Sequence, residues 1–348
     1  MDLPRDPQEE RTPRHGWLDR LGQSWFPPAA VVGVFAALVA GVYRSRPAAP
    51  PALAPTQRPG APEPVSPLPA LDLPRQYSAS AVLGGATSAY PFRRALAGVA
   101  VGSDDRIHAL GDNEVRVYDA SGEFIRRWQV PEGTACLAAG RDGRVLVGSL
   151  GRVDVYEADG RHAGGFASGE AGRPAAVTSI KLFEDQILVA DAAARFIRRH
   201  DPTGRQIGEI GNQNKTRGFI LPNQWLDFDV DSSGVIRATD TGRHRVTAWA
   251  LDGTALGFFG TFNQRDPRGF VGCCNPVNLA LTPDGKVVTA EKMVARVKVY
   301  EPDGTLLAVI DPQHFDQKCT HLHLGTDSEG RILVADPVRR EVKVFAWS

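Results

Sequence analysis

The sequence predicts an all-β protein, a six-bladed β-propeller that follows an N-terminal transmembrane helix and a Pro/Ala-rich linker. Three observations lead to this prediction: an uncharged apolar stretch near the N-terminus, a proline-rich stretch after it, and six copies of a strand-and-turn pattern in the rest of the chain. We therefore divide the 348 residues into a short tail (1–24), a membrane anchor (25–43), a linker (44–75) and the propeller (76–348).

The expected anchor reads WFPPAAVVGVFAALVAGVY and has no charged side chain in 19 residues. A helix needs about 20 such residues to cross a bilayer, and Trp25 and Tyr43 stand at its ends, where interfacial aromatic residues are expected. A cleaved signal peptide is the alternative. The leader before the apolar run is long and acidic for a signal peptide, and Val39 and Gly41 form only a weak cleavage site.

The linker is rich in proline, with ten prolines between residues 47 and 74. Such a segment is stiff and extended, and at ~3.1 Å per residue it reaches up to roughly 90 Å. Arginines on both sides of the anchor leave its orientation open. Because this kind of spacer suits a domain held away from the outer face of a membrane, we expect a single-pass protein of the inner (cytoplasmic) membrane. Its propeller would then lie in the periplasm or at the cell exterior.

Charge restricts the class of partner. The chain has 40 basic and 40 acidic residues, whereas a general nucleic-acid binder needs surplus Lys and Arg to displace counterions. We therefore expect no nucleic-acid partner. The expected partners are the membrane, through the anchor, and either a protein or a small anionic ligand.

The repeats predict the blades. One pattern is a β-rich run that ends in an Asp/Gly turn, and it begins at Val115, Val153, Ile197, Val246 and Val297, with a truncated copy at Val342. Before each copy stands an apolar run, a turn of the DxxG type and a second apolar run. Four such strands make one propeller blade. The last copy lacks its outer strand, and the segment QYSASAVL (76–83) is expected to supply it and close the ring.

The segment ATDTGRHRVTAW (238–249) resembles the signature of the NHL-repeat family of six-bladed propellers. Other copies fit more loosely, with Asp191 beside Arg195, Glu291 beside Arg296, and Asp336 beside Arg339. The resemblance covers about residues 97–348 and implies the propeller fold. It does not imply one activity, because the family includes interaction modules, lyases and lactonase-like hydrolases.

The propeller topology sorts charged residues between two faces. The loops between blades and those between second and third strands form what we call the top face, and the other turns form the bottom face. Aspartates gather on the bottom (104, 105, 142, 159, 201, 231, 252, 284, 303 and 327). Cations gather on the top (Arg152, Arg195, Arg198, Arg243, Arg245, Lys292, Arg296, Arg339 and Arg340). Two interpretations stay open: a top face that attracts anions, or arginines that each pair with the acid ending the preceding strand.

Three long loops (211–222, 260–273 and 311–320) fall on the top face of blades 4 to 6. Long polar loops on a rigid scaffold commonly carry function, so the binding site is expected there. The ligand-binding candidates are Asn223, Trp225, Arg243, His244, Arg265, Arg268, Asn275 and Asn278.

Alignment of the blades brings cysteine and histidine residues to equivalent positions. Cys274 and Cys319 occupy the same position on blades 5 and 6, and His321 and His323 follow on the innermost strand. A disulfide between Cys319 and Cys274 or Cys273 is one interpretation. A copper or zinc site built from Cys273, Cys274, Cys319, His321 and His323 is the second. Redox-active thiols and buried inert thiols are the third and fourth.

The innermost ring also suggests an enzymatic alternative. It comprises Gly98, Cys136, Thr178, Asp227, Asn278 and His323. Asp227, Asn278 and His323 resemble the ligands with which lactonase-like propellers hold a divalent cation such as calcium. Gly98 stands where that resemblance implies a glutamate. A metal-dependent hydrolase or lyase at the channel mouth is therefore the alternative to a binding module, and no catalytic residue is assigned.

Overall fold

The computed structural model describes residues 73–212 and 218–347, so the predicted anchor and nearly all of the linker lie outside the described residues. Within that described part, no helix is both long enough and apolar enough to cross a membrane. The regular secondary structure of the described chain is almost entirely β-strand, apart from the short 3-10 turns η2 (Thr241–Arg243) and η3 (Pro312–His314).

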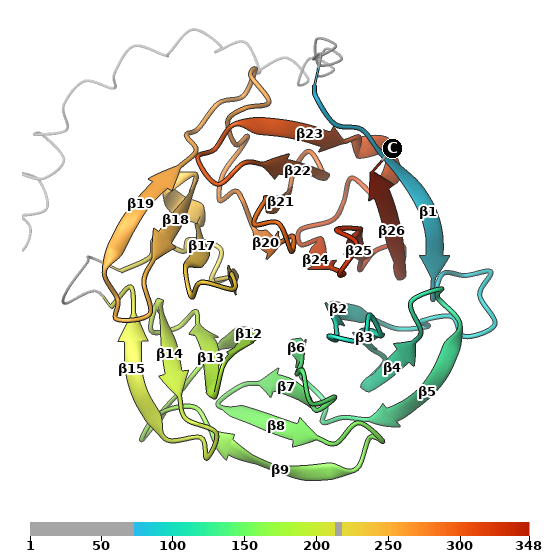
Figure 1. Cartoon of the computed structure of the whole chain (residues 1–348), viewed down its shortest axis with the longest axis vertical. Coiled ribbons are helices and arrows are strands. Elements are labelled where there is room, and N and C mark those ends of the chain that lie inside the picture. Colours follow the sequence, from blue (N-terminus) through green and yellow to red (C-terminus); the bar gives the residue numbers. More distant parts are fainter. Residues whose placement is uncertain (1–72, 213–217, 348) are drawn as a thin grey trace, which may run out of the picture. The chain divides into compact units, whose positions relative to one another are not determined.

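Six four-stranded antiparallel sheets surround a central channel, which confirms the six-bladed propeller (Figure 1). Blade 1 contains β2 (Leu96–Val101), β3 (Ile107–Gly111), β4 (Glu114–Tyr118) and β5 (Phe124–Gln129). Blade 2 contains β6 (Cys136–Ala139), β7 (Val145–Ser149), β8 (Arg152–Tyr156) and β9 (His162–Ala167). Blade 3 contains β12 (Val177–Phe183), β13 (Gln186–Asp191), β14 (Phe196–His200) and β15 (Gln206–Ile210). A small hairpin of β10 (Gly169–Glu170) and β11 (Arg173–Pro174) joins blades 2 and 3.

The second half of the ring repeats the same order from inner to outer strand. Blade 4 contains β16 (Phe228–Val230), β17 (Ile236–Asp240), β18 (Arg245–Trp249) and β19 (Ala255–Phe259). Blade 5 contains β20 (Asn278–Leu281), β21 (Val287–Glu291), β22 (Arg296–Tyr300) and β23 (Leu306–Ile310). Blade 6 contains β24 (His323–Thr326), β25 (Ile332–Asp336) and β26 (Glu341–Trp347), and β1 (Tyr77–Leu83) is its outer strand.

The ring closes as the repeats predict. Strand β1 pairs antiparallel with β26, in a register that runs from Tyr77 opposite Trp347 to Leu83 opposite Val342. Leu83 is buried in a cluster with Leu96 of blade 1 and Val342 of blade 6. The strand therefore supplies the missing outer strand of blade 6, pairs with the edge of β26, and adds an apolar contact to blade 1.

The bottom aspartates build the turns. Asp142, Asp159, Asp231 and Asp303 each accept a backbone N–H from the residue two positions later, at 2.9–3.1 Å. This side-chain-to-backbone bond is the reason that Asp favours tight turns. Apolar clusters fill the space between neighbouring blades; one, for example, joins blade 5 to blade 6 through Val297 and Val334.

The top arginines pair mainly with acids inside the fold, as the second interpretation of this face predicts. Arg198 contacts Asp191 at 2.8 Å, Arg243 and Arg245 contact Asp240, Arg296 contacts Glu291, and Arg339 contacts Asp336. The partner of Asp191 is Arg198 on the adjacent strand β14, whereas Arg195 has no ion pair within the described residues. Acids at the ends of second strands also accept backbone N–H groups from incoming loops.

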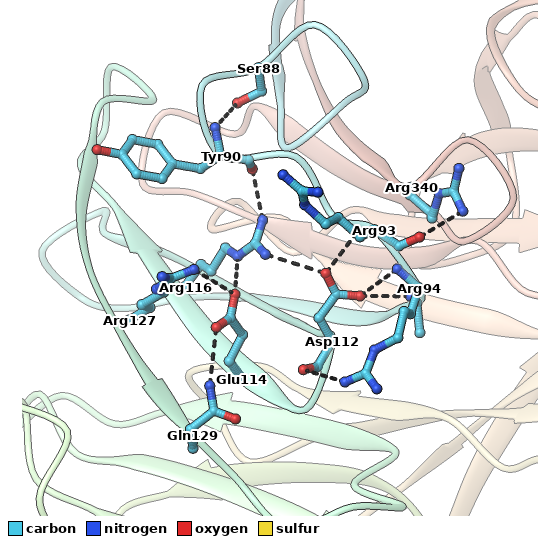
Figure 2. A network of polar contacts seen from close by, with 11 residues as sticks. Ser88, Tyr90, Arg93, Arg94, Asp112, Glu114, Arg116, Arg127, Gln129 and Arg340 are labelled. Atoms are coloured by element: carbon cyan, nitrogen blue, oxygen red, sulfur yellow. Dashed lines mark hydrogen bonds and ion pairs between the residues drawn. The ribbon is translucent and has the colours of Figure 1, made fainter.

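Figure 2 shows how blade 1 uses this arrangement. Asp112 accepts the backbone N–H groups of Arg93, Arg94 and Ala95 at 2.7–2.9 Å. Arg116 contacts Asp112 at 3.4 Å and Glu114 at 2.6 Å, and it donates to the Tyr90 carbonyl at 2.7 Å. The carboxylate thereby ties the loop that enters the blade to the second and third strands. These charges stabilise the scaffold and are not free to bind an anion.

Candidate ligand site at the channel mouth

The inner-strand alignment places the channel residues correctly. Cys136, Asn278 and His323 begin strands β6, β20 and β24, Thr178 lies in β12, and Asp227 directly precedes β16. Because the chain enters each blade from the top face, these residues lie around the top mouth of the channel. The channel mouth is defined here by Asn223, Trp225, Asp227, Asn278, His321 and His323.

Trp225 is the residue that brings two distant blades together. It belongs to the loop entering blade 4, but its ring centroid lies 4.5 Å from that of His321 and 5.7 Å from that of His323, both at the start of blade 6. The two imidazole rings stack 6.4 Å apart. The indole of the loop that enters blade 4 therefore contacts both imidazoles of blade 6, although blade 5 lies between these two blades in the ring.

Four polar atoms at this mouth are buried without a hydrogen-bond partner. They are Asn223 Nδ2, Trp225 Nε1, Asn278 Oδ1 and His321 Nε2. Asn223 uses its other amide atom, because Oδ1 accepts from the Thr241 hydroxyl at 2.9 Å. More than nine in ten buried polar groups in proteins are paired, so a cluster of unpaired ones points to a group that is not part of the chain.

The two histidines are neutral near pH 7. Burial lowers the pKa of His321 to about 4, and the nearby Lys292 ammonium adds to this shift. Burial likewise lowers the pKa of His323 to about 3, with a smaller contribution from His321. The Lys292 amine forms no hydrogen bond or ion pair within residues 73–212 and 218–347, so the mouth holds one unpaired cation beside two neutral imidazoles.

The Asp227 carboxylate already accepts hydrogen bonds from other residues of the protein. Its Oδ2 accepts from Asn278 Nδ2 and from the Leu279 backbone N–H, each at 3.0 Å. Burial raises its pKa. Below it in the channel, Lys181 contacts Asp229 at 3.4 Å; burial acts to lower the pKa of Lys181, but Asp229 and Asp227 raise it on balance. The Lys181–Asp229 ion pair could not be predicted from the sequence, because its two residues belong to different blades.

The cysteines do not come together as a disulfide or a soft-metal cluster in the described part of the chain. All four are free thiols, and only Cys273 is exposed. The Cys319 thiol donates to Asp336 Oδ1 at 3.0 Å, and burial together with this bond raises its pKa to about 12. Burial also raises the pKa of Cys136 to about 12. Over residues 73–212 and 218–347, no three His, Cys, Asp or Glu side chains are grouped to hold a metal ion.

The remaining ligand-binding candidates contribute to loops rather than to the channel mouth. Asn275 is fully buried and bonds the main chain of Val271 and Lys292. Arg243 pairs with Asp240 and with the Gly218 carbonyl, while His244 bonds the Gly272 carbonyl at 2.8 Å. Arg265 and Arg268 are exposed on the loop entering blade 5, where Arg268 pairs with Asp266 at 3.4 Å.

A cavity of about 770 Å³ opens at the other end of the channel, lined by turns from all six blades. Its wall mixes apolar side chains such as Leu182, Phe183 and Leu281 with several carboxylates. The sequence predicted the site on the top face, so this space at the bottom face was not anticipated. Its lining does not include the four residues that hold the buried unpaired polar atoms of the top mouth.

Comparisons with known proteins support the fold. No protein-family model matches the chain, and no curated protein matches it. Among solved structures, streptogramin B lyase is similar with a TM-score of 0.53 and 11% identity, over 79% of this chain and 98% of that one. The WD40 propeller domain of Doa1 has a TM-score of 0.52 and 16% identity, over 78% and 97%.

A chain of the mitotic checkpoint complex is similar at a TM-score of 0.53 and 12% identity, over 77% of this chain and 93% of that one. At these identities the similarity establishes the β-propeller architecture only.

Proposed function

We propose that the protein is a binding module and that its channel mouth takes a small anionic ligand. The observation that carries this proposal is the cluster of four buried, unpaired polar atoms around Trp225. Asn223 Nδ2 and Trp225 Nε1 are donors, Asn278 Oδ1 is an acceptor, and His321 Nε2 can serve either role. Lys292 supplies the unpaired positive charge beside them.

This chemistry defines the class of ligand. A carboxylate accepts from Lys292 and from the indole and amide N–H groups, and charge-assisted bonds of this kind are about twice as strong as neutral ones. A flat apolar group stacks against Trp225. The metal-dependent hydrolase or lyase alternative has less support, because Asp227 is already bonded to Asn278 and Leu279 and because the first blade contributes Gly98 to the ring.

Benzoate is a suitable probe, and its binding should depend on Trp225. Replacing Trp225→Ala is expected to weaken benzoate binding at least about tenfold, or ~1.4 kcal/mol, because the stacking surface and one donor are lost. Lys292→Gln is expected to weaken it about fivefold. Calorimetric titration of the full-length protein measures both. The affinity should stay constant from pH 6 to pH 8, since His321 and His323 have pKa values of about 4 and 3.

Two controls make the benzoate experiment specific. Arg265→Gln removes an exposed loop cation outside the mouth and should leave binding unchanged. Benzamide has the shape of benzoate without its charge and should bind more weakly. Equal binding of benzamide and benzoate, or an unaltered affinity in Trp225→Ala, would show that the mouth is not an anion site.

A protein partner on the same face is the second candidate function, favoured by an apolar patch of Ile220, Phe262 and Met293. These side chains are 41%, 51% and 63% exposed. Ile220 packs against Gly242, Phe262 against His244, and Met293 against Gly272, and His244 bonds Gly272, so the three side chains lie on neighbouring segments of blades 4 and 5. Exposed apolar patches of this kind commonly mark protein-binding surfaces.

We also propose that residues 25–43 anchor the chain in the membrane, with the propeller outside the cytoplasm.

Site-specific photo-cross-linking in cells tests the protein-partner candidate. A cross-linker at Met293 and one at Phe262 should capture the same discrete partner. A cross-linker at Leu256, which is 54% exposed on the outer strand β19, is the matched control and should not capture it. Different products at Met293 and Phe262, or the same product at Leu256, would contradict a specific surface on the top face.

A further inference from the structure

A second pocket lies on the bottom face between blades 1 and 2, away from the channel mouth. It has a volume of about 250 Å³, and its lining includes Ser103, Arg106, His108, Arg126 and Arg141. The residues come from the β2–β3 turn, strands β3 and β5, and the β6–β7 turn. We refer to it as the His108 pocket. Its volume suits a small ion or a terminal group rather than a large ligand.

The charge of the His108 pocket is positive on balance. Arg106 pairs with Asp104 at 3.1 Å, and Asp142 pairs with Arg144 at 2.6 Å. The other two arginines of the lining, Arg126 and Arg141, have no ion pair within the described residues. Arg126 Nη1 donates to the Ala158 carbonyl at 3.2 Å, which holds this guanidinium at the wall of the pocket.

His108 supplies an unpaired polar atom in the same wall. Its side chain is only 6% exposed, and Nδ1 is buried without a hydrogen-bond partner. Burial lowers its pKa to about 4, so the imidazole is neutral near pH 7. A neutral imidazole has one nitrogen that accepts a hydrogen bond. Leaving such a buried atom unpaired is unfavourable, and this cost is relieved when a ligand supplies a donor.

We propose that the His108 pocket binds a protonated phosphate group, with Arg126 and Arg141 holding its negative oxygens and His108 Nδ1 accepting its P–OH proton. Arginine matches phosphate oxygens through its fork of N–H donors. Sulfate has the same shape and negative charge but carries no proton at neutral pH. The unpaired acceptor should therefore favour hydrogen phosphate over sulfate. This inference does not depend on the function proposed for the channel mouth.

Calorimetric titration of the full-length protein with inorganic phosphate tests the proposal. Phosphate should bind, and sulfate should bind at least about tenfold more weakly, because a P–OH donor is missing. Arg141→Gln, at an exposed residue that does not endanger folding, should weaken phosphate binding about fivefold or more. His108→Phe keeps a ring of similar size without the acceptor and should remove most of the preference for phosphate over sulfate.

The matched control is Arg161→Gln. Arg161 is an exposed arginine on the bottom face of blade 2 that does not line the pocket, and its loss should leave phosphate binding unchanged. Trp225→Ala should also leave it unchanged, which separates this site from the channel mouth. Glycerol 3-phosphate distinguishes a free ion from a monoester as the natural source of the group. Equal binding of sulfate and phosphate, absence of phosphate binding, or full binding by Arg141→Gln would overturn the proposal.

Discussion

Replacing Glu291→Ala is expected to destabilise the protein by about 3–5 kcal/mol, the typical cost of removing one partner from a buried ion pair. The Glu291 carboxylate is fully buried and accepts from Arg296 at 2.5 Å, from Lys298 at 3.2 Å and from the Val271 backbone N–H at 2.8 Å. Arg296 and Lys298 are themselves 1% or less exposed. The variant would leave two buried cations without a counter-charge. Urea unfolding followed by circular dichroism measures the loss.

The loss should depend on pH with a definite sign. Burial lowers the pKa of Lys298 to about 7 in the folded protein, below its ordinary value near 10.4. Because the unfolded chain then binds more protons, stability rises with pH above about 7. Without Glu291 the pKa of Lys298 falls further, so this rise begins at a lower pH. The difference between variant and wild type should therefore shrink as the pH is raised from 5 to 7.

A matched acid on the surface is the control for Glu291. Glu329 is 70% exposed and contacts Arg331 at 3.4 Å, so Glu329→Ala should change stability by no more than about 0.5 kcal/mol. The double variant Glu291→Met/Lys298→Met should recover part of the loss, since apolar residues of similar volume often replace buried ion pairs without cost. A loss below about 1 kcal/mol in Glu291→Ala would show that the buried charges relax into water.

The blades could be predicted because their signals are local. An aspartate that bonds the backbone two residues later determines its own turn, and this is what Asp142, Asp159 and Asp231 do. The number of such turns predicted six blades and showed that the last repeat lacks its outer strand. The alignment also placed Cys136, Thr178, Asn278 and His323 on inner strands, because residues at equal distances from equivalent turns occupy equivalent positions.

The contacts between side chains could not be read from that alignment. Cys274 and Cys319 are equivalent in position, but Cys274 has a left-handed backbone (φ 63°) and Cys319 bonds Asp336 instead. Two residues at equivalent positions of neighbouring repeats need not have side chains that point in the same direction. The partner of Asp191 is Arg198 and not Arg195 for the same reason. The backbone of Arg195 is left-handed (φ 61°), whereas Arg198 lies on the neighbouring strand. The reach of Trp225 to blade 6 depends on tertiary packing and had no sequence signal.

Removal of β1 is expected to have the other large effect on stability. A chain that begins at residue 84 lacks the strand that pairs with β26 from Tyr77 to Leu83, whereas a chain that begins at residue 67 keeps it. Loss of the buried Leu83 side chain alone costs about 2–5 kcal/mol, and at about 2–4 °C per kcal/mol the shorter chain should melt roughly 10 °C or more below the longer one. It should also self-associate, because β26 becomes an open edge. Calorimetry and light scattering compare the two chains.

Two neighbouring residues of β1 separate strand pairing from a general effect of shortening the chain. Leu83 is 5% exposed and packs between blades 6 and 1, whereas Val82 is 51% exposed on the other side of the strand. Leu83→Ala should therefore cost about 2–5 kcal/mol, and Val82→Ala no more than about 0.5 kcal/mol. Equal effects of the two substitutions would contradict the register seen here. If the two chains melted at the same temperature, the ring would be closed by the contacts between β24 and β2 rather than by the outer strand.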